Sequence, residues 1–236
     1  MKKNIIILSI FLLLGLQLRA QFTISYSSGY GKYDMGDMKD ALELFKSSMK
    51  EQLGGLDIRT VDNFPGYITH TLEVGHKVGK SEFGLKSSFY TTGGKLSYAD
   101  YSGGYEQKIT MRGFREGIYF RYHFYTTEIG YQSAFSIYGE LSPSLLVSQM
   151  KHSLSIGITD EGEDKLNNKS TKVGVAIMPL VGVKYSITPK IGVHLSAGYD
   201  FDLTTPKTKI DLQSAILETK SDWSGIRAFA GVSYSF

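Results

Sequence analysis

The last fourteen residues, 223–236, alternate between apolar and polar side chains with a period of two, which is the period of a β-strand. One face is uniformly apolar from Ile226 to Phe236, whereas the other carries glycine, serine and Arg227, with Phe229 as an exception. A soluble sheet packs its apolar face into a core, but a membrane barrel turns that face to lipid and its polar face to the lumen. The segment therefore predicts the closing strand of a transmembrane β-barrel.

Residues 1–20 are typical of a secretory signal peptide. Lys2 and Lys3 precede a short apolar run, residues 5–16, and the small residue Ala20 ends the segment. The run is shorter than the roughly 18 to 20 residues that a membrane-spanning helix needs. We therefore expect a cleaved signal peptide over 1–20 and a barrel over 21–236, delivered to the bacterial outer membrane.

The charge balance and the lack of cysteine exclude several classes of site. The signal segment holds three of the 26 basic residues and none of the 23 acidic ones, so the remainder has 23 of each. Such a balance predicts no nucleic-acid partner. Without cysteine there is no disulfide framework, thiolate zinc site or cysteine nucleophile. The acidic run 160–164 lacks the spacing of a calcium loop, so we predict a solvated loop there, with no metal and no cofactor.

Seven further segments alternate as the last one does, and together they predict eight strands. Short turns are expected at 79–81 and 188–190 and a medium connection at 126–135. Long loops are expected elsewhere, among them a tyrosine-rich loop at 95–109 and a polar loop at 159–170. This asymmetry is typical of a barrel with tight turns at one end and long loops at the other, whereas a soluble sandwich does not require it. No later segment is long and apolar enough for a spanning helix, so we expect an all-β fold, a closed antiparallel transmembrane barrel. A hidden hairpin in 126–135 would make ten strands. The other seven strands are expected at 21–31, 65–78, 82–90, 113–125, 136–156, 171–187 and 191–203.

The segment 136–156 changes the parity of its apolar residues near Lys151. Ile137, Leu141 and Leu145 fall on odd positions, whereas Leu154 and Ile156 fall on even ones. A single extra residue in a strand reverses its faces in this way, so the change predicts a β-bulge.

The first long loop contains an amphipathic helix, expected at about 37–53, because its apolar residues recur at spacings of three and four. The apolar stripe needs a partner. We favour a helix that folds onto the external end of the barrel, and an interfacial or partner-binding helix is the alternative. The apolar residues of the stripe are Met38, Leu42, Phe45, Met49 and Leu53.

The lumen of an eight-stranded barrel is only wide enough for side chains to fill. Alternation directs eleven charged residues into it, and unpaired charges there would cost several kcal/mol each. We therefore predict a plugged lumen with cross-strand ion pairs, and a narrow pore is the alternative. The inward charged residues are Glu73, Lys77, Glu82, Lys86, Arg115, Arg121, Glu140, Lys184, Asp200, Asp202 and Arg227.

His194 and Ser196 place a base and a hydroxyl on one face of a strand, with Asp200 and Asp202 further along it. Some outer-membrane lipid A deacylases use a similar His-x-Ser pair with an acidic partner, so a lipid-modifying esterase is the enzymatic alternative. A lipid substrate would reach the outer surface more easily than the lumen. We therefore expect His194 to be a polar lumen residue, and the chain not to be an enzyme.

Several short motifs are distributed along the chain from the end of the signal segment to the last residue. They are Ala20-Gln21, Met35-Gly36-Asp37-Met38, Asn63-Phe64-Pro65-Gly66-Tyr67, Tyr98-Ala99-Asp100-Tyr101-Ser102-Gly103, Asp222-Trp223-Ser224-Gly225 and Ser233-Tyr234-Ser235-Phe236. With these motifs, residues 21–236 resemble the PorT-like family of outer-membrane β-barrel proteins. The resemblance implies an eight-stranded barrel that the outer-membrane assembly machinery inserts, with Tyr234 and Phe236 as the assembly signal.

Together these patterns predict an outer-membrane barrel with a structural or surface-interaction role. Its expected surroundings are outer-membrane lipid and lipopolysaccharide, and we expect a monomer. The helix and the tyrosine-rich loop are expected to present an external surface to a partner that the sequence does not identify. The residues assigned to that surface are Leu42, Phe45, Met49, Tyr98, Tyr101 and Tyr105.

Overall fold

The computed structural model of the chain describes residues 21–52, 57–101, 103–129, 132–158, 162–204, 207–212 and 215–236. The expected signal peptide, residues 1–20, lies outside the described residues, as do Asp160 and Glu161 of the acidic run. Among the helical residues that the structure describes, none forms a segment with the length and hydrophobicity to span a bilayer.

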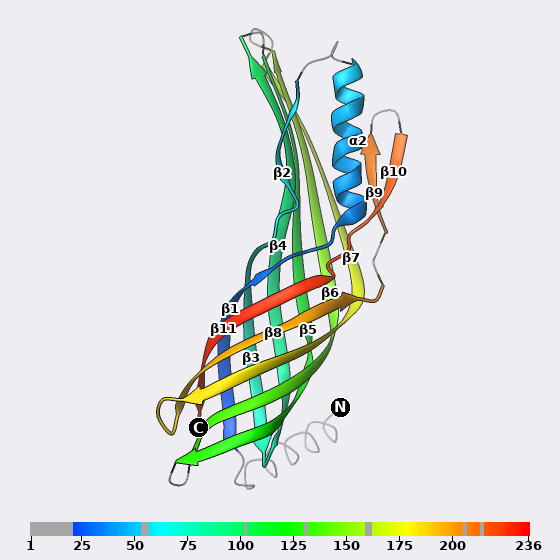
Figure 1. Cartoon of the computed structure of the whole chain (residues 1–236). Coiled ribbons are helices and arrows are strands. Elements are labelled where there is room, and N and C mark those ends of the chain that lie inside the picture. Colours follow the sequence, from blue (N-terminus) through cyan, green and yellow to red (C-terminus); the bar gives the residue numbers. More distant parts are fainter. Residues whose placement is uncertain are drawn as a thin grey trace, which may run out of the picture.

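Eight antiparallel strands form a closed ring (Figure 1). The ring follows the order β1-β3-β4-β5-β6-β7-β8-β11, and β11 pairs with β1 to close it. This confirms the predicted all-β antiparallel barrel with eight strands, and the ten-strand alternative is wrong. The strands are β1 (Gln21–Gly31), β3 (Tyr67–Val78), β4 (Ser81–Asp100), β5 (Gly103–Ile129), β6 (Gln132–Ile158), β7 (Gly162–Ser186), β8 (Ile191–Asp202) and β11 (Gly225–Ser235).

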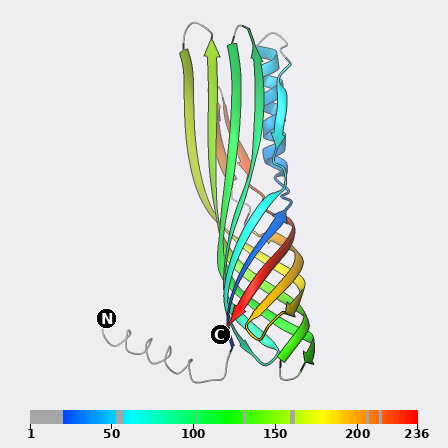
Figure 2. The same ribbon diagram turned by 90° about the vertical axis from the view of Figure 1, so that its left-hand side faces the viewer.

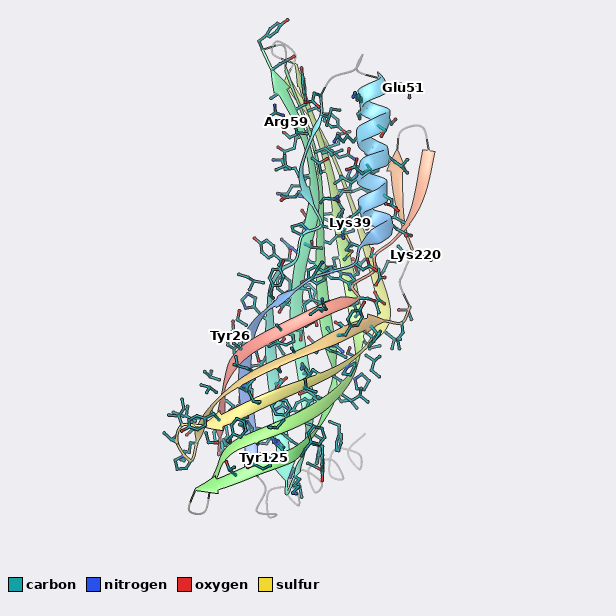
Figure 3. All side chains as sticks on the ribbon, viewed as in Figure 1. Tyr26, Lys39, Glu51, Arg59, Tyr125 and Lys220 are labelled. Atoms are coloured by element: carbon teal, nitrogen blue, oxygen red, sulfur yellow. The ribbon has the colours of Figure 1, made fainter. Side chains whose placement is uncertain are left out.

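The outward face of the ring is apolar. Leu85 and Leu195, for example, are exposed to 65% and 58%, on a face shared by most of the large apolar side chains of the barrel strands. Tyr26 marks this face in Figure 3. Two polar outward residues each have a hydrogen bond: Ser87 Oγ donates to Glu116 at 2.6 Å, and Tyr26 Oη lies 2.8 Å from Nδ1 of His70. The ring thus has the inverted polarity of a membrane barrel.

Four strands continue beyond the ring. β3 pairs with β4 only as far as His70 opposite Phe89, and β8 pairs with β7 only as far as Asp202 opposite Ala176. Past these points β4, β5, β6 and β7 run on as an open sheet (Figure 2). We call this sheet, with the elements joined to it, the extension. Those elements are β2 (Arg59–Asn63), which pairs with β4 at the edge of the sheet, the helix α2 (Gly36–Gln52), and the hairpin of β9 (Lys207–Leu212) and β10 (Ala215–Lys220), which contacts α2.

Three predicted connections are wrong because strands continue through them. The expected loop 95–109 is a β4–β5 hairpin that is paired from Lys95 opposite Lys108 to Asp100 opposite Gly103. The expected loop 159–170 belongs largely to β7, which pairs with β6 from Gly162 onward. The connection 126–135 is taken up by the ends of β5 and β6, which pair as far as Ile129 opposite Gln132. In the first two segments, polar and glycine-rich sequence forms strands because these strands belong to the extension, where α2 covers one face of the sheet (Figure 1).

The predicted β-bulge at Lys151 is also wrong. The register of β6 with both neighbours is continuous there, and the shifts lie instead between His123 and Tyr125 and between Thr127 and Glu128. The parity of apolar residues changes because the inward face of β6 passes from the polar lumen to the core beneath α2, where Leu146 and Met150 are buried.

α2 lies lengthwise on the sheet of the extension and buries its apolar stripe against it (Figure 1). Met38, Leu42 and Phe45 share one core cluster with residues of β4, β5 and β6. The helix therefore folds onto the end of the barrel, which was the favoured prediction for its apolar stripe. Its aromatic contact is with His152, whose ring stacks on Phe45 at 6.1 Å. The buried strand residues of the cluster are Tyr90, Leu96, Tyr105, Ile109, Met111, Leu146, Met150 and Ala176 of β7.

This packing corrects the predicted external surface. Leu42, Phe45 and Tyr105 are buried, and Met49 and Tyr98 are partly buried against the same cluster, so these five residues do not form a free face. Tyr101 alone of the six is fully open, with 96% exposure at the end of the β4–β5 hairpin. The physical reason is that β4 to β6 extend far enough to supply the partner that the stripe needs.

The inverted polarity predicts that substitutions on the outward face depend on depth. Ala197 lies in the middle of the outward apolar series of β8, and its replacement by Arg should destabilise the barrel by about 2 to 4 kcal/mol in lipid. Ile191, at the end of the same series, serves as control, and Ile191→Arg should have an effect of about 0 to 1 kcal/mol. Urea unfolding in phospholipid vesicles measures both. Equal effects at the two depths would contradict the assigned membrane face.

The docked helix predicts a local effect of core truncation. Phe45→Ala removes a buried ring and should weaken the docking of α2 by about 3 to 5 kcal/mol. Hydrogen exchange of the α2 amides should accelerate, while the barrel strands keep their protection. Leu44→Ala, at a neighbouring position with 59% exposure, is the matched control and should leave exchange unchanged. An unchanged rate in Phe45→Ala would show that α2 does not depend on this core.

Candidate functional site

The inward faces of the ring strands carry buried polar side chains, as their alternation with outward apolar residues requires. Ser25 and Ser27 of β1 and Thr71 of β3 are examples. Of the eleven predicted lumen residues, eight are buried and form two groups of ion pairs along the barrel. They are Glu73, Glu82, Lys86, Arg115, Arg121, Glu140, Asp200 and Arg227.

The first group is a four-residue network across the lumen. Lys86 Nζ lies 2.9 Å from Glu73 and 2.6 Å from Glu140, and Arg121 contacts both of the same carboxylates, with 2.8 Å to Glu73. Each cation therefore bridges the same two anions, from β3 and β6. Since every member is buried, the pairing supplies the compensation that charges need in a low-dielectric interior.

Glu82 extends this network toward the β3–β4 turn. It accepts a hydrogen bond of 2.7 Å from the Tyr119 hydroxyl and lies 3.3 Å from Arg121 Nη1. His123 Nε2 lies 3.5 Å from the second Glu82 oxygen, and its Nδ1 is 3.1 Å from Ser136 Oγ. These three partners of the Glu82 carboxylate all come from β5, so Glu82 fixes the inward side chains of that strand.

Aromatic rings fill the space around Arg121. Its guanidinium carbon lies 4.9 Å from the ring centroid of Tyr119 and 4.5 Å from that of Tyr138, so it is held between two faces. A Cβ on Gly75 would lie 1.9 Å from the Tyr119 hydroxyl oxygen, and one on Gly182 would lie 2.5 Å from the Tyr138 ring. These two glycines make room for rings that close the lumen.

A small apolar cluster adds to this filling and accounts for the exception in the closing strand. Phe229 packs with Tyr138, Met178 and Leu180 inside the barrel, and its ring centroid lies 5.7 Å from Lys86 Nζ. The ring faces inward because it fills a gap beside the ion network, where a polar side chain would lack a partner.

The second group lies where the ring meets the extension. Asp200 stands between two guanidinium groups, 3.7 Å from Arg115 and 3.6 Å from Arg227. Arg227 donates hydrogen bonds to the Lys32 and Trp223 carbonyl oxygens and lies between the rings of Tyr33 and Tyr90 at 4.5 and 5.0 Å. This cation therefore holds the segments before α2 and before β11 at the mouth of the barrel.

Three predicted lumen residues lie outside both groups. Lys77 and Lys184 are half-buried and form no salt bridge with a described residue. Asp202 ends β8, where its carboxylate accepts hydrogen bonds from the backbone N–H groups of Trp223 at 3.4 Å and Thr204 at 3.3 Å. Asp202 thus shapes the connection after β8.

The pair on which the esterase alternative rests, His194 and Ser196, is not arranged as a base and a nucleophile. His194 is buried, and its Nε2 lies 2.9 Å from Ser27 Oγ of β1. Asp200, the nearest acidic candidate on the strand, is held by Arg115 and Arg227. Ser196, His194 and Asp200 therefore do not form a hydrogen-bonded triad. Among the described residues, no group of His, Asp or Glu is placed to hold a metal ion.

Sequence reasoning missed the aromatic partners of the arginines. The alternation of β5 places Tyr119 on the same inward face as Arg121, so this contact could have been predicted. Tyr138, Tyr33 and Tyr90 lie far in sequence from the arginines that they contact, and alternation does not predict such pairs. Trp223 was expected to open a strand; it instead lies buried just before β11, where its Nε1 donates to Ser148 Oγ at 3.0 Å.

No protein-family model matches the chain, and no curated protein matches it. Among solved structures, the outer membrane protein OprG from Pseudomonas aeruginosa is 12% identical, with a TM-score of 0.48 over 92% of this chain and 96% of OprG. Neisserial surface protein A is 13% identical, with a TM-score of 0.41 over 92% and 99%. Ail of Yersinia pestis is 10% identical, with a TM-score of 0.38 over 92% and 97%. Because the identities are 10 to 13% and the TM-scores are below 0.5, nothing about the activity of this chain follows from these similarities.

The ion network predicts a large effect of removing its central cation. Arg121→Met leaves the carboxylates of Glu73, Glu82 and Glu140 short of positive charge, and should destabilise the barrel by about 3 to 5 kcal/mol. Lys95→Met breaks the more exposed pair with Glu106, at 2.9 Å, and should lose less than about 1 kcal/mol. Urea unfolding in vesicles compares the two variants. Similar losses in the free energy of unfolding would show that the ion pairs in the lumen stabilise the barrel no more than an exposed pair does.

Proposed function

We propose that this chain is an integral β-barrel protein of the bacterial outer membrane, with a closed lumen and a structural or surface-interaction role exercised through the extension. Membership of the PorT-like family, non-enzymatic action and a monomeric state are parts of this proposal. The observation that carries it is the layer of ion pairs and aromatic rings around Arg121, which fills the barrel where a channel would have to pass.

The inverted polarity supports a membrane location. In hydrocarbon every backbone N–H and C=O must be satisfied within the protein, and a closed barrel does this with strands. The outward face supplies an apolar surface, and aromatic side chains such as Tyr122 and Tyr185 lie exposed on it near the turns. A signal peptide over 1–20 would deliver such a chain across the inner membrane.

The end of the chain supports assembly by the machinery that inserts outer-membrane barrels. The Phe236 N–H donates to the Phe22 carbonyl oxygen at 2.9 Å, so the last residue continues the ladder that closes the ring. Tyr234 and Phe236 face outward with 41% and 65% exposure, and their rings are 4.9 Å apart. An outward aromatic pair on the last strand is accessible while the barrel is still open.

A lumen closed in this way favours a role outside the membrane over transport. The extension is the part of the molecule that a closed barrel leaves free to act, and it holds Tyr101 at its tip. An esterase remains the enzymatic alternative, and the bond from His194 to Ser27 instead of Ser196 favours a structural role for this histidine.

The proposal predicts that the purified barrel does not conduct. In planar bilayers the wild-type protein should give no discrete channel currents, because side chains fill the lumen. A variant with Tyr119→Ala, Arg121→Ala and Tyr138→Ala removes the central filling and should conduct if folded, as judged by a heat-dependent gel shift. Stable ion-selective channels from the wild-type barrel would support the narrow-pore alternative and contradict this proposal.

A further inference from the structure

The sheet of the extension has one covered face and one open face. Leu96, Ile109 and Met150 point toward α2 and are buried in the core beneath it. Because side chains alternate along a strand, the residues between them lie on the opposite face. No described element covers that face (Figure 2).

Among the side chains that the structure describes, four cations are exposed on this open face. None of them forms a salt bridge with a residue in the described part of the chain, whereas Lys95 on the same face is paired with Glu106 at 2.9 Å. We call the four the basic face. They are Lys108 and Arg112 of β5, Lys151 of β6 and Lys169 of β7.

The strand register brings these like charges together. Lys151 lies directly opposite Lys169, and Thr110 lies opposite Lys151, so Lys151 is diagonal to both Lys108 and Arg112. Directly opposed side chains have Cβ atoms about 5 Å apart, and like charges in such pairs are destabilising. An anion bound to this surface would relieve the repulsion, so the arrangement favours an anionic ligand with several charged groups.

The height of the basic face identifies the kind of ligand. Going along β5 from the ring toward the extension, Phe114 is the last apolar residue on the outward face. Arg112 lies roughly 7 Å farther along the strand in that direction, at 3.3 Å a residue. Lys108 lies roughly 20 Å beyond Phe114 on the same measure. The cations thus begin where the apolar surface ends and continue outward, through the depth that charged lipid headgroups and their attached sugars occupy in an outer leaflet.

We infer that the basic face binds the phosphate groups of lipopolysaccharide in the leaflet around the barrel. The inference rests on the proposed outer-membrane location. A guanidinium group binds phosphate in a bidentate manner, so Arg112 suits the phosphates nearest the acyl chains, and the three lysines suit those of the inner sugars. A soluble polyanion would give no reason for the cations to start at the edge of the apolar surface.

The test compares two variants that each lose four positive charges. The basic-face variant carries Lys108→Gln, Arg112→Gln, Lys151→Gln and Lys169→Gln. The control variant carries Lys50→Gln, Lys80→Gln, Lys190→Gln and Lys220→Gln, at exposed positions elsewhere. The Kd for rough lipopolysaccharide is measured with each barrel in zwitterionic detergent, for the intact and for the dephosphorylated lipid, and heparin serves as a soluble polyanion.

The basic-face variant should bind intact lipopolysaccharide at least about tenfold more weakly than wild type, because each cation near an anionic lipid surface contributes a factor of roughly five. The control variant should stay within about twofold. Dephosphorylated lipid should bind wild type as weakly as intact lipid binds the basic-face variant. A heat-dependent gel shift and insertion into vesicles show that all three proteins are folded barrels.

Three results would overturn the inference while leaving the proposed barrel intact. The basic-face variant could bind as tightly as wild type, the control variant could lose as much affinity, or heparin could bind wild type in preference to lipopolysaccharide. Failure of the wild-type protein to insert into vesicles is a different result, because it would contradict the outer-membrane barrel itself.

Discussion

The rest of the structure depends on one constraint, which is that backbone hydrogen bonds in a membrane must be made within the protein. The ring meets it by pairing each strand with two neighbours, and the pairing of β11 with β1 removes the last free edge. Once the backbone is satisfied, the pleat assigns side chains alternately to lipid and lumen. The apolar outward face and the charged interior are therefore two results of a single arrangement.

The interior then has to compensate its own charges, because water cannot do so in a packed lumen. The group around Arg121 contains two cations and three carboxylates, whereas the group around Asp200 contains two guanidinium groups and one carboxylate. Neither group is neutral alone, and their formal charges are opposite. Aromatic rings stacked on Arg121 and Arg227 add stabilisation that does not depend on a second carboxylate.

The sequence was enough to predict the ring, its inverted polarity and the docked helix, because a period of two or of 3.6 residues reports which face a side chain occupies. It was not enough to say what covers that face. Leu154 faces inward because it packs against the core beneath α2, although its position suggested a β-bulge. Tyr105 is buried in the same core, although its segment was expected to be a loop. Likewise, parity placed Glu73 and Arg121 in the lumen, but only the register of distant strands selects their partners and the ring of Tyr138.

The continuity of β5 and β6 has a mechanical consequence. Each is a single strand of 27 residues that runs between the ring and the extension without a linker, β5 toward the ring and β6 away from it. From Phe114 to Gly103, at the tip of the extension, β5 covers roughly 36 Å at 3.3 Å a residue. A force applied at Tyr101 would therefore tilt the whole barrel in its bilayer, because no flexible linker separates the extension from the ring. The distance between the tip and the ring is set by the length of these strands.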